Sequence, residues 1–260
     1  MNKIFFKLFK RSDRFFSRTL FLAAGLASLL LAASVMAGQV SENQVSGEAQ
    51  VVPTVKNEEL KKAENLDVAS VLASIRRQYL QEMAFSGRFT QKTTYSDSHE
   101  TTLSMGLIWI QGPDKMRWEY QLPEKQLLVS DGQTLWYYTP DLNQVMTGSV
   151  KDIKEARIII NLLSELQLQA EKFKLAVTKV DDRIVVELAP LANDPAPPFQ
   201  KLEMIFSAAS YMLAETRMVD LFANEIVITY KWQSGPDKAL PRSFFTFIPP
   251  AGCDMMPLGQ

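Results

Sequence analysis

The sequence predicts a mainly β fold of the α+β class, in which an antiparallel sheet is rolled toward a barrel. Many short segments alternate apolar and polar residues, as residues 116–121 do, and this period places one face of each strand against a core. Tight-turn signals such as Asp131-Gly132 and Pro140-Asp141 separate nearly all of these segments. Helical stretches are too few to connect parallel strands, so neighbouring strands are expected to pair antiparallel.

The N-terminal segment predicts export. Residues 3–18 carry six Lys and Arg side chains, residues 20–35 are an apolar run, and Val35-Met36-Ala37 matches a small-x-small cleavage site. We therefore interpret residues 1–37 as a secretory signal peptide. The alternative is an uncleaved inner-membrane anchor, because the run approaches the ~18 apolar residues that span a bilayer.

The charge that remains after this peptide argues against a nucleic-acid partner. Of the 28 basic and 29 acidic residues, residues 1–37 hold six and one, which leaves 22 basic and 28 acidic residues and a net charge of −6. Nucleic acids and anionic lipid surfaces attract basic proteins instead. A mildly acidic surface suits a protein that stays off the bilayer at rest.

A tether and an amphipathic helix are expected next. Residues 38–64 are polar and acidic, which indicates a flexible tether, and residues 65–260 are long enough for one β-rich domain. A helix is predicted over residues 66–84, with Asp67 as its N-cap. Its apolar stripe recurs at three- and four-residue spacing and consists of Val68, Leu72, Ile75, Tyr79 and Met83. This pattern fits a helix laid on a sheet and a helix that covers an opening equally well.

The strands are expected in twelve segments, and a second helical segment interrupts them. The segments are 85–92, 103–109, 116–121, 125–130, 134–138, 144–147, 173–180, 183–188, 201–207, 212–219, 225–232 and 244–248. In the second segment, Leu103, Met105, Leu107 and Trp109 are predicted to form the apolar face. Residues 151–168 have a more helical composition, with most of their Ile and Leu side chains in residues 158–168.

The polar residues favour a binding protein over an enzyme, and we expect no cofactor and no metal. His99 is the only histidine and lies in a polar run that is expected to form a hairpin loop, so it cannot hold a metal by itself. Cys253 is the only cysteine, and a thiol dyad with His99 would require opposite ends of the chain to meet. Asp131 and Asp141 are first of all turn formers.

A series of short sequence blocks runs through the predicted domain in a characteristic order. They are Phe89-Thr90-Gln91-Lys92, Gly106-x-x-Trp109, Pro113, Arg117-Trp118-Glu119-Tyr120, Pro123, Leu128-Val129-Ser130-Asp131-Gly132-x-Thr134-Leu135-Trp136, Tyr138-x-Pro140, Gln144 and Phe245-Thr246-Phe247-x-Pro249-Pro250-x-Gly252. In this order they resemble the LolA family of periplasmic outer-membrane lipoprotein carriers. The resemblance covers residues 66–252 and is most specific over residues 113–144.

The resemblance implies an incomplete antiparallel β-barrel with helices forming a lid over the open side, namely residues 66–84 and 158–168. It implies a periplasmic chaperone that binds the acyl chains of lipoproteins in an apolar cavity and acts as a monomer. An inner-membrane lipoprotein-releasing ABC transporter would load it, and an outer-membrane lipoprotein receptor would unload it. The acyl-chain-binding residues expected are Met105, Leu107, Met116, Trp118, Tyr120, Trp136, Leu72, Ile75, Ile159 and Leu163.

One departure from the family concerns the lid. The family usually has Arg directly before the proline matched by Pro113, where it bonds lid backbone and holds the empty form closed, but this sequence has Gly112. Lys115 and Arg117 are close in sequence but match other positions of the family. Two alternatives stay open: a periplasmic lipid-binding or envelope-sensing module on a similar half-barrel, and the same carrier left tethered to the inner membrane.

Overall fold

The structure, a computed structural model, describes residues 67–79, 84–112, 114–151, 173–192, 194, 197, 199–233 and 238–258. Over these residues the predicted β-rich fold is confirmed: one helix, α3 (Val68–Tyr79), accompanies a single twelve-stranded sheet. The strands are β1 (Ala84–Thr94), β2 (Thr101–Gln111), β3 (Lys115–Leu122), β4 (Gln126–Asp131), β5 (Thr134–Thr139), β6 (Gln144–Ser149), β7 (Phe173–Val180), β8 (Arg183–Pro190), β9 (Lys201–Ser207), β10 (Leu213–Val219), β11 (Glu225–Trp232) and β12 (Asp254–Pro257).

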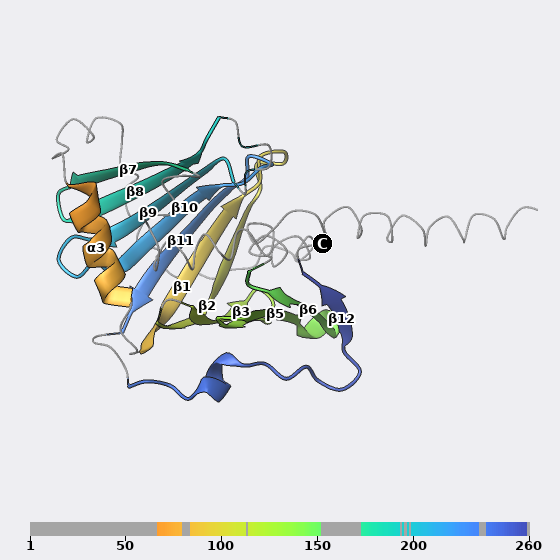
Figure 1. Cartoon of the computed structure of the whole chain (residues 1–260). Helices are drawn as coiled ribbons and strands as arrows, with labels where there is room; N and C mark the ends of the chain where they lie inside the picture. The colour runs from red at the N-terminus through yellow and green to blue at the C-terminus, as the bar shows by residue number, and fades with distance from the viewer. Residues whose placement is uncertain are drawn as a thin grey trace, which may run out of the picture.

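Two antiparallel meanders share this sheet, and its strand order is β12-β6-β5-β4-β3-β2-β1-β11-β10-β9-β8-β7. Strands β1–β6 form one meander and β7–β11 the other, and the antiparallel pair of β1 with β11 joins them. The sheet does not close on itself, because β7 and β12 are its edges (Figure 1). One pair differs from the expected antiparallel arrangement: β12 lies parallel to β6.

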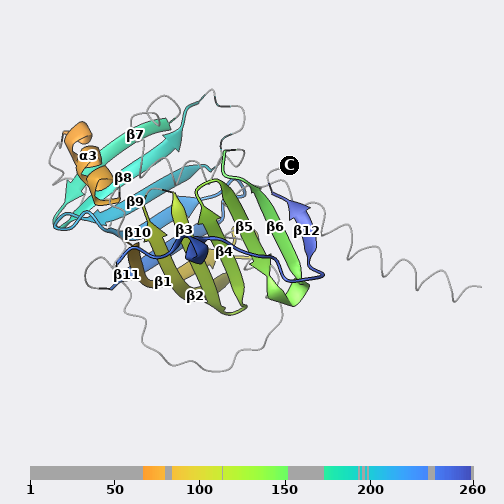
Figure 2. The same ribbon diagram turned by 60° about the horizontal axis from the view of Figure 1, so that its bottom comes forward.

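The sheet bends sharply around β1 and β2, where Figures 1 and 2 show its two wings turning toward each other. Strands β3 and β11 are three places apart in the sheet, which is ~14 Å when a sheet is flat. The rings of Trp118 on β3 and Tyr230 on β11 are nevertheless only 5.9 Å apart. These two side chains therefore mark the concave face.

Gly106 on β2 allows this bend. Phe89 on β1 covers Gly106, and a Cβ at that position would lie 2.7 Å from Phe89 Cε1 and would overlap the carbonyl oxygen of Glu119. The pairing of β2 with β3 also shifts register between Met105 and Gly106. A side chain at residue 106 would push β1 and β3 apart, whereas glycine lets the aromatic rings of both strands meet across β2.

Helix α3 is shorter than the sequence predicts. The Asp67 carboxylate caps it by accepting bonds from Ala69 N and from Ser70 Oγ, and the Ser70 bond contributes most to lowering the pKa of Asp67. The helix is described as far as Tyr79, residues 80–83 lie outside the described part, and Ala84, the last residue of the predicted helix, already belongs to β1. The buried stripe of the helix consists of Val71, Leu72, Ile75 and Tyr79.

A C-terminal strap, residues 238–253, crosses the convex face of the sheet. The predicted strand at residues 244–248 is wrong, because residues Arg242–Phe245 form the 3-10 helix η3 and the chain around it runs without strand pairing. The aromatic side chains explain the difference: Phe244 packs on Trp109 and Phe247 on Tyr138, so this segment binds the sheet face-on. The chain then adds β12, which the sequence did not predict.

Several predictions fall on residues outside the described part: the signal peptide 1–37, the tether 38–64 and the second helical segment, of which only residue 151 is described. Among the described residues, no helix combines the length and the hydropathy that a membrane span requires.

Candidate functional site

The concave face of the sheet carries one continuous apolar cluster. Its members come from α3 and from strands of both wings, and all are buried. The four buried side chains of α3 belong to this cluster, so the helix packs on the concave side (Figure 1). The convex face has no comparable continuous cluster among the described residues, because the strap covers part of it and charged side chains occupy much of the rest.

Aromatic rings form the centre of the concave face. The Phe89 ring lies 4.8 Å from the Trp118 ring and 4.8 Å from the Tyr120 ring, measured between centroids. Tyr230 extends the group to β11 and stacks on Trp232 at 5.7 Å. Edge-to-face and stacked contacts of this kind stabilise a site beyond the area that they bury. The result is an aromatic floor on the concave face, formed by Phe89, Trp118, Tyr120, Tyr230 and Trp232.

The structure brings together five of the ten predicted acyl-chain-binding residues. Met116, Trp118 and Tyr120 alternate along β3 on the concave face, and Leu72 and Ile75 face it from α3; all five belong to the one cluster. Ile159 and Leu163 lie outside the described residues.

The other three predicted residues lie on the convex face, which corrects the expectation that all ten share one surface. Met105 and Leu107 pair with Thr90 and Arg88 of β1, whose side chains are exposed on the face opposite Phe89. Trp136 lies opposite Val129 and Thr147, again on the convex side.

The physical reason for this correction is that β2 is covered on both faces. Its concave positions include Ser104, Gly106 and Ile108, and its convex positions include Met105, Leu107 and Trp109, the last of which packs on Phe244 of the strap. Apolar alternation identifies two faces but does not say which one lines the concave side. Tyr230 and its neighbours on β11 were not among the predicted site residues, because their concave position follows only from the pairing of β1 with β11.

Tyr79 fastens α3 to the sheet. Its hydroxyl accepts a hydrogen bond from Leu213 N at 2.8 Å, and burial raises its pKa. The register between β9 and β10 shifts directly after Leu213, which leaves the Leu213 backbone N–H available for this bond. Trp232 Nε1 donates a hydrogen bond to the Leu213 carbonyl oxygen. Gln78 adds a bond from Nε2 to the Met212 sulfur at 3.4 Å.

The basic residues near the expected latch position do not contact α3. Gly112 adopts φ +63°, a conformation that favours glycine. Lys115 and Arg117 occupy convex positions of β3, where Lys115 lies 3.9 Å from Asp114 and Arg117 bonds Glu119 and the carbonyl oxygen of Phe244. The guanidinium also lies 5.0 Å from the centre of the Phe244 ring. Arg117 therefore holds the strap, whereas Lys115 lies next to Asp114.

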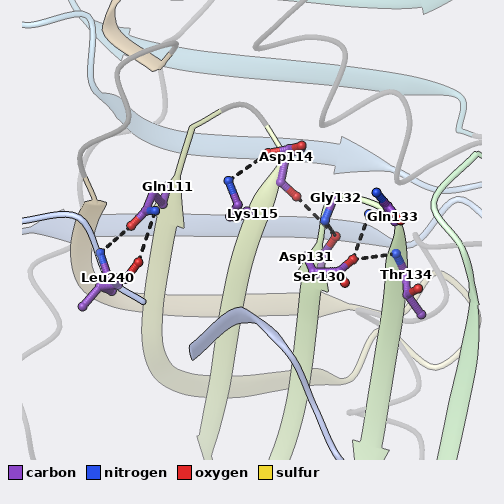
Figure 3. Close-up of polar contacts among 9 residues, drawn as sticks. All are labelled: Gln111, Asp114, Lys115, Ser130, Asp131, Gly132, Gln133, Thr134 and Leu240. Carbon is purple, nitrogen blue, oxygen red and sulfur yellow. Dashed lines mark hydrogen bonds and ion pairs between the residues drawn. The ribbon is translucent and has the colours of Figure 1, made fainter. Parts of the chain in front are cut away.

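Turns at one end of the sheet fix the strand register (Figure 3). The β4–β5 loop consists of Gly132 and Gln133, one residue later than the predicted Asp-Gly pair. Asp131 Oδ1 accepts bonds from Gln133 N and Thr134 N at 2.9 and 2.8 Å, and Gly132 takes φ +92°. At the same end, Gln111 exchanges two hydrogen bonds with the Leu240 backbone of the strap.

The chemically reactive residues do not form a centre. His99 is exposed in the β1–β2 hairpin with φ +58°. The Cys253 thiol lies 3.1 Å from Asn143 Oδ1, to which it donates a hydrogen bond. Among the described residues, no group of three or more His, Cys, Asp or Glu side chains could hold a metal ion.

Comparisons with known proteins agree with the architecture. The LolA family profile, described as outer membrane lipoprotein carrier protein LolA, matches residues 81–248. The outer-membrane lipoprotein carrier protein of Methylibium petroleiphilum is 33% identical over 168 residues, 65% of this chain and 80% of the relative. That of Chromobacterium violaceum is 31% identical over 189 residues, 72% of this chain and 88% of the relative.

A solved structure of a LolA superfamily protein from Nitrosomonas europaea aligns with 69% of this chain and 97% of its own, at 14% identity and a TM-score of 0.39. This similarity is too weak to add to the assignment. The profile match covers more than half of the sequence and most of the sheet, from β1 to the strap. The chain therefore belongs to the LolA family of outer membrane lipoprotein carrier proteins.

Proposed function

We propose that this protein is a periplasmic carrier that binds the acyl chains of lipoproteins released from the inner membrane and delivers them to the outer membrane. The observation that supports it most is the bent sheet of a LolA-family chain, whose concave face carries one continuous apolar cluster to which α3 contributes four buried side chains. The signal peptide predicted at residues 1–37 supports a periplasmic location. It acts by binding rather than catalysis, as a monomer that accepts cargo from a lipoprotein-releasing ABC transporter and passes it to an outer-membrane receptor.

Exchange between α3 and the cargo keeps binding reversible. Burial of one methylene group yields about 0.8 kcal/mol, so two or three long acyl chains reach some tens of kcal/mol, more than noncovalent complexes show. Displacement of the four buried side chains of α3 removes about 1.5–3 kcal/mol each, roughly 6–12 kcal/mol together. In this mechanism α3 serves as a lid that fills the concave face of the empty carrier and lowers the net affinity for cargo.

A release assay tests the proposal. Spheroplasts are incubated with protein purified from cells that express the full chain, and the supernatant is examined for lipoproteins in a one-to-one complex with it. Release is expected from the wild type. Release of free phospholipid without lipoproteins would refute the carrier function and favour a general lipid-binding module.

A matched pair of variants locates the binding surface. Val177 on β7 is half-buried and packs against the concave cluster, so Val177→Glu places a charge in the path of the acyl chains. Val185 on β8 is also half-buried but points to the convex side, opposite Ile205. We expect Val177→Glu to reduce lipoprotein release at least tenfold and Val185→Glu to leave it within about twofold. Equal release by both variants would show that cargo binds elsewhere.

A further inference from the structure

The concave face divides into two parts that differ in polarity. Over β8–β11 it is mainly apolar, with side chains such as Val186, Met204 and Ile228; the hydroxyls of Thr216 and Tyr230 also lie there, 3.2 Å apart. Over β1–β4, uncharged polar side chains gather toward the end with the β1–β2 hairpin. This polar band consists of Gln91, Thr93, Thr102, Ser104, Tyr120 and Gln126. All except the half-buried Thr102 are buried, and Gln91 is 0% exposed.

Strand register places these residues side by side. Gln91 pairs with Ser104 and Thr93 with Thr102 across β1 and β2, and Tyr120 pairs with Gln126 across β3 and β4. Gln91 and Thr93 follow Phe89 along β1 at two-residue spacing, and Tyr120 follows Trp118 along β3 in the same way. The band therefore shares the concave face with the aromatic floor.

Hydrogen bonds orient the polar groups of the band. The Tyr120 hydroxyl donates to Gln91 Oε1 at 3.1 Å, and Gln91 Nε2 donates to Thr93 Oγ1 at 3.3 Å. Tyr137 on β5 donates to Gln126 Oε1 at 2.8 Å. Burial raises the pKa of Tyr120 well above its usual range, so this hydroxyl stays a donor at all physiological pH values.

Two further hydroxyls at this end have unused hydrogen-bonding capacity. Within the part of the chain that the structure describes, neither Tyr95 Oη nor Thr102 Oγ1 has a hydrogen-bond partner, although both atoms are buried. Thr102 belongs to the band, and Tyr95 directly follows β1 and packs against the same cluster. Because buried polar atoms are nearly always paired in folded proteins, these two point to a ligand with acceptor atoms.

The polar band carries no charge. The concave positions of β1–β5 include no Lys, Arg, Asp or Glu, whereas the convex positions of the same strands include Arg88, Lys92 and Arg117. A phosphate or carboxylate group buried beside the band would lack a cationic partner, which is strongly unfavourable. Ester and amide groups, which accept hydrogen bonds without charge, fit the same donors.

We propose that the polar band binds the uncharged ester and amide groups of an acylated lipoprotein anchor and so orients the acyl chains across Phe89 and Trp118 into the apolar part of the face. This inference rests on the proposed carrier function and names its substrate class. Acylated anchors, whose ester and amide groups adjoin no anionic group, are selected over anionic phospholipids, whose phosphate adjoins the same esters, and over free fatty acids.

The test removes polarity from the centre of the band. In the triple variant Gln91→Leu/Thr93→Val/Tyr120→Phe, the three side chains that the two hydrogen bonds join become apolar at similar size, and replacing both partners of a hydrogen bond in this way costs little stability. The control is Thr94→Val/Thr101→Val, which removes a hydroxyl pair 3.3 Å apart on the convex side of β1 and β2. Protein purified from cells that express the full chain is titrated with a triacylated cysteinyl lipopeptide, hexadecanoic acid and dihexadecanoyl phosphatidylglycerol.

We expect the wild type to bind the lipopeptide most tightly. The band variant should weaken lipopeptide binding about tenfold and change hexadecanoic acid binding less than twofold, and the control should change neither. Unchanged lipopeptide affinity, or an equal loss for both probes, would overturn the inference, and so would tighter binding of phosphatidylglycerol by the wild type. Failure of the wild type to bind any of the three probes would instead refute the carrier function itself.

Discussion

Replacement of Gly106 by alanine tests whether the bend of the sheet depends on a missing side chain. The added Cβ would lie 2.7 Å from Phe89 Cε1 and 2.9 Å from the Glu119 carbonyl carbon, and it would overlap the Glu119 carbonyl oxygen. A flexible ring can move, but the Glu119 backbone is held by the pairing of β3 with β2 and β4. The strands would therefore have to separate.

The expected loss follows from that overlap. Overpacking a core typically lowers the free energy of unfolding by about 1–3 kcal/mol, and a clash with paired backbone belongs at or above the top of that range. We expect Gly106→Ala to lose at least about 3 kcal/mol, which in a domain of this size lowers the Tm by roughly 6–12 °C. Urea unfolding measures this loss of free energy. Tryptophan fluorescence is a suitable signal because Trp118 packs on the Phe89 ring that covers Gly106.

The control is Gly252→Ala. Nothing lies within 4 Å of a Cβ at that position, although φ is +79°, so its loss is limited to the ~1–2 kcal/mol of left-handed backbone strain. If Gly106→Ala loses less than Gly252→Ala and keeps the wild-type near-UV circular dichroism, then the bend does not depend on a glycine at residue 106.

Three further predictions concern α3, alkaline pH and the strap. Tyr79→Phe removes the bond to Leu213 N and should lower stability by about 1–2 kcal/mol in urea unfolding, whereas Tyr138→Phe on the convex face should change it by less than ~0.5 kcal/mol. Burial raises the pKa values of Tyr79, Tyr120, Tyr137 and Tyr230; the unfolded chain therefore ionises first, and stability that is complete below pH ~10 should fall above it by about 1.4 kcal/mol per pH unit for each tyrosine. Tyr79→Phe should reduce this alkaline slope by about a quarter, and an unchanged slope would contradict the assignment. Phe244→Ala loses the contacts with Trp109 and Arg117, so it should lower the free energy of unfolding by about 1–3 kcal/mol without changing lipopeptide affinity. The control is Ile248→Ala, for which no change in stability is expected because the Ile248 side chain is 88% exposed.

Local patterns were enough to find most of the strands. Eleven of the twelve predicted segments overlap an observed strand, and the turn after Asp131 differs by one residue. The exception, residues 244–248, shows the limit of such patterns, because aromatic residues that pack face-on against a sheet have the same composition as a strand. The helix at α3 was found from its apolar stripe, but its end was not, because helix termini depend on what the next residues pair with.

The candidate site was only half predictable for a related reason. Met116, Trp118 and Tyr120 were placed on one face by their spacing, and the structure confirms that they share it. Met105 and Leu107 have the same spacing on the next strand, yet they face the opposite side, where they pair with Thr90 and Arg88 of β1 and where Trp109 of the same strand packs on Phe244. A period of two tells which residues share a face of a strand, but which face becomes concave is decided by how the strands pair.

The sequence by itself determined the β-rich class, the meander order and the family, because alternation, turn residues and ordered motifs are local properties of the chain. Only the tertiary structure decided the register between β1 and β11, the bend over Gly106 and the division of the concave face into apolar and polar parts. These features depend on contacts between strands that are distant in sequence, and such contacts form only when the whole sheet is assembled.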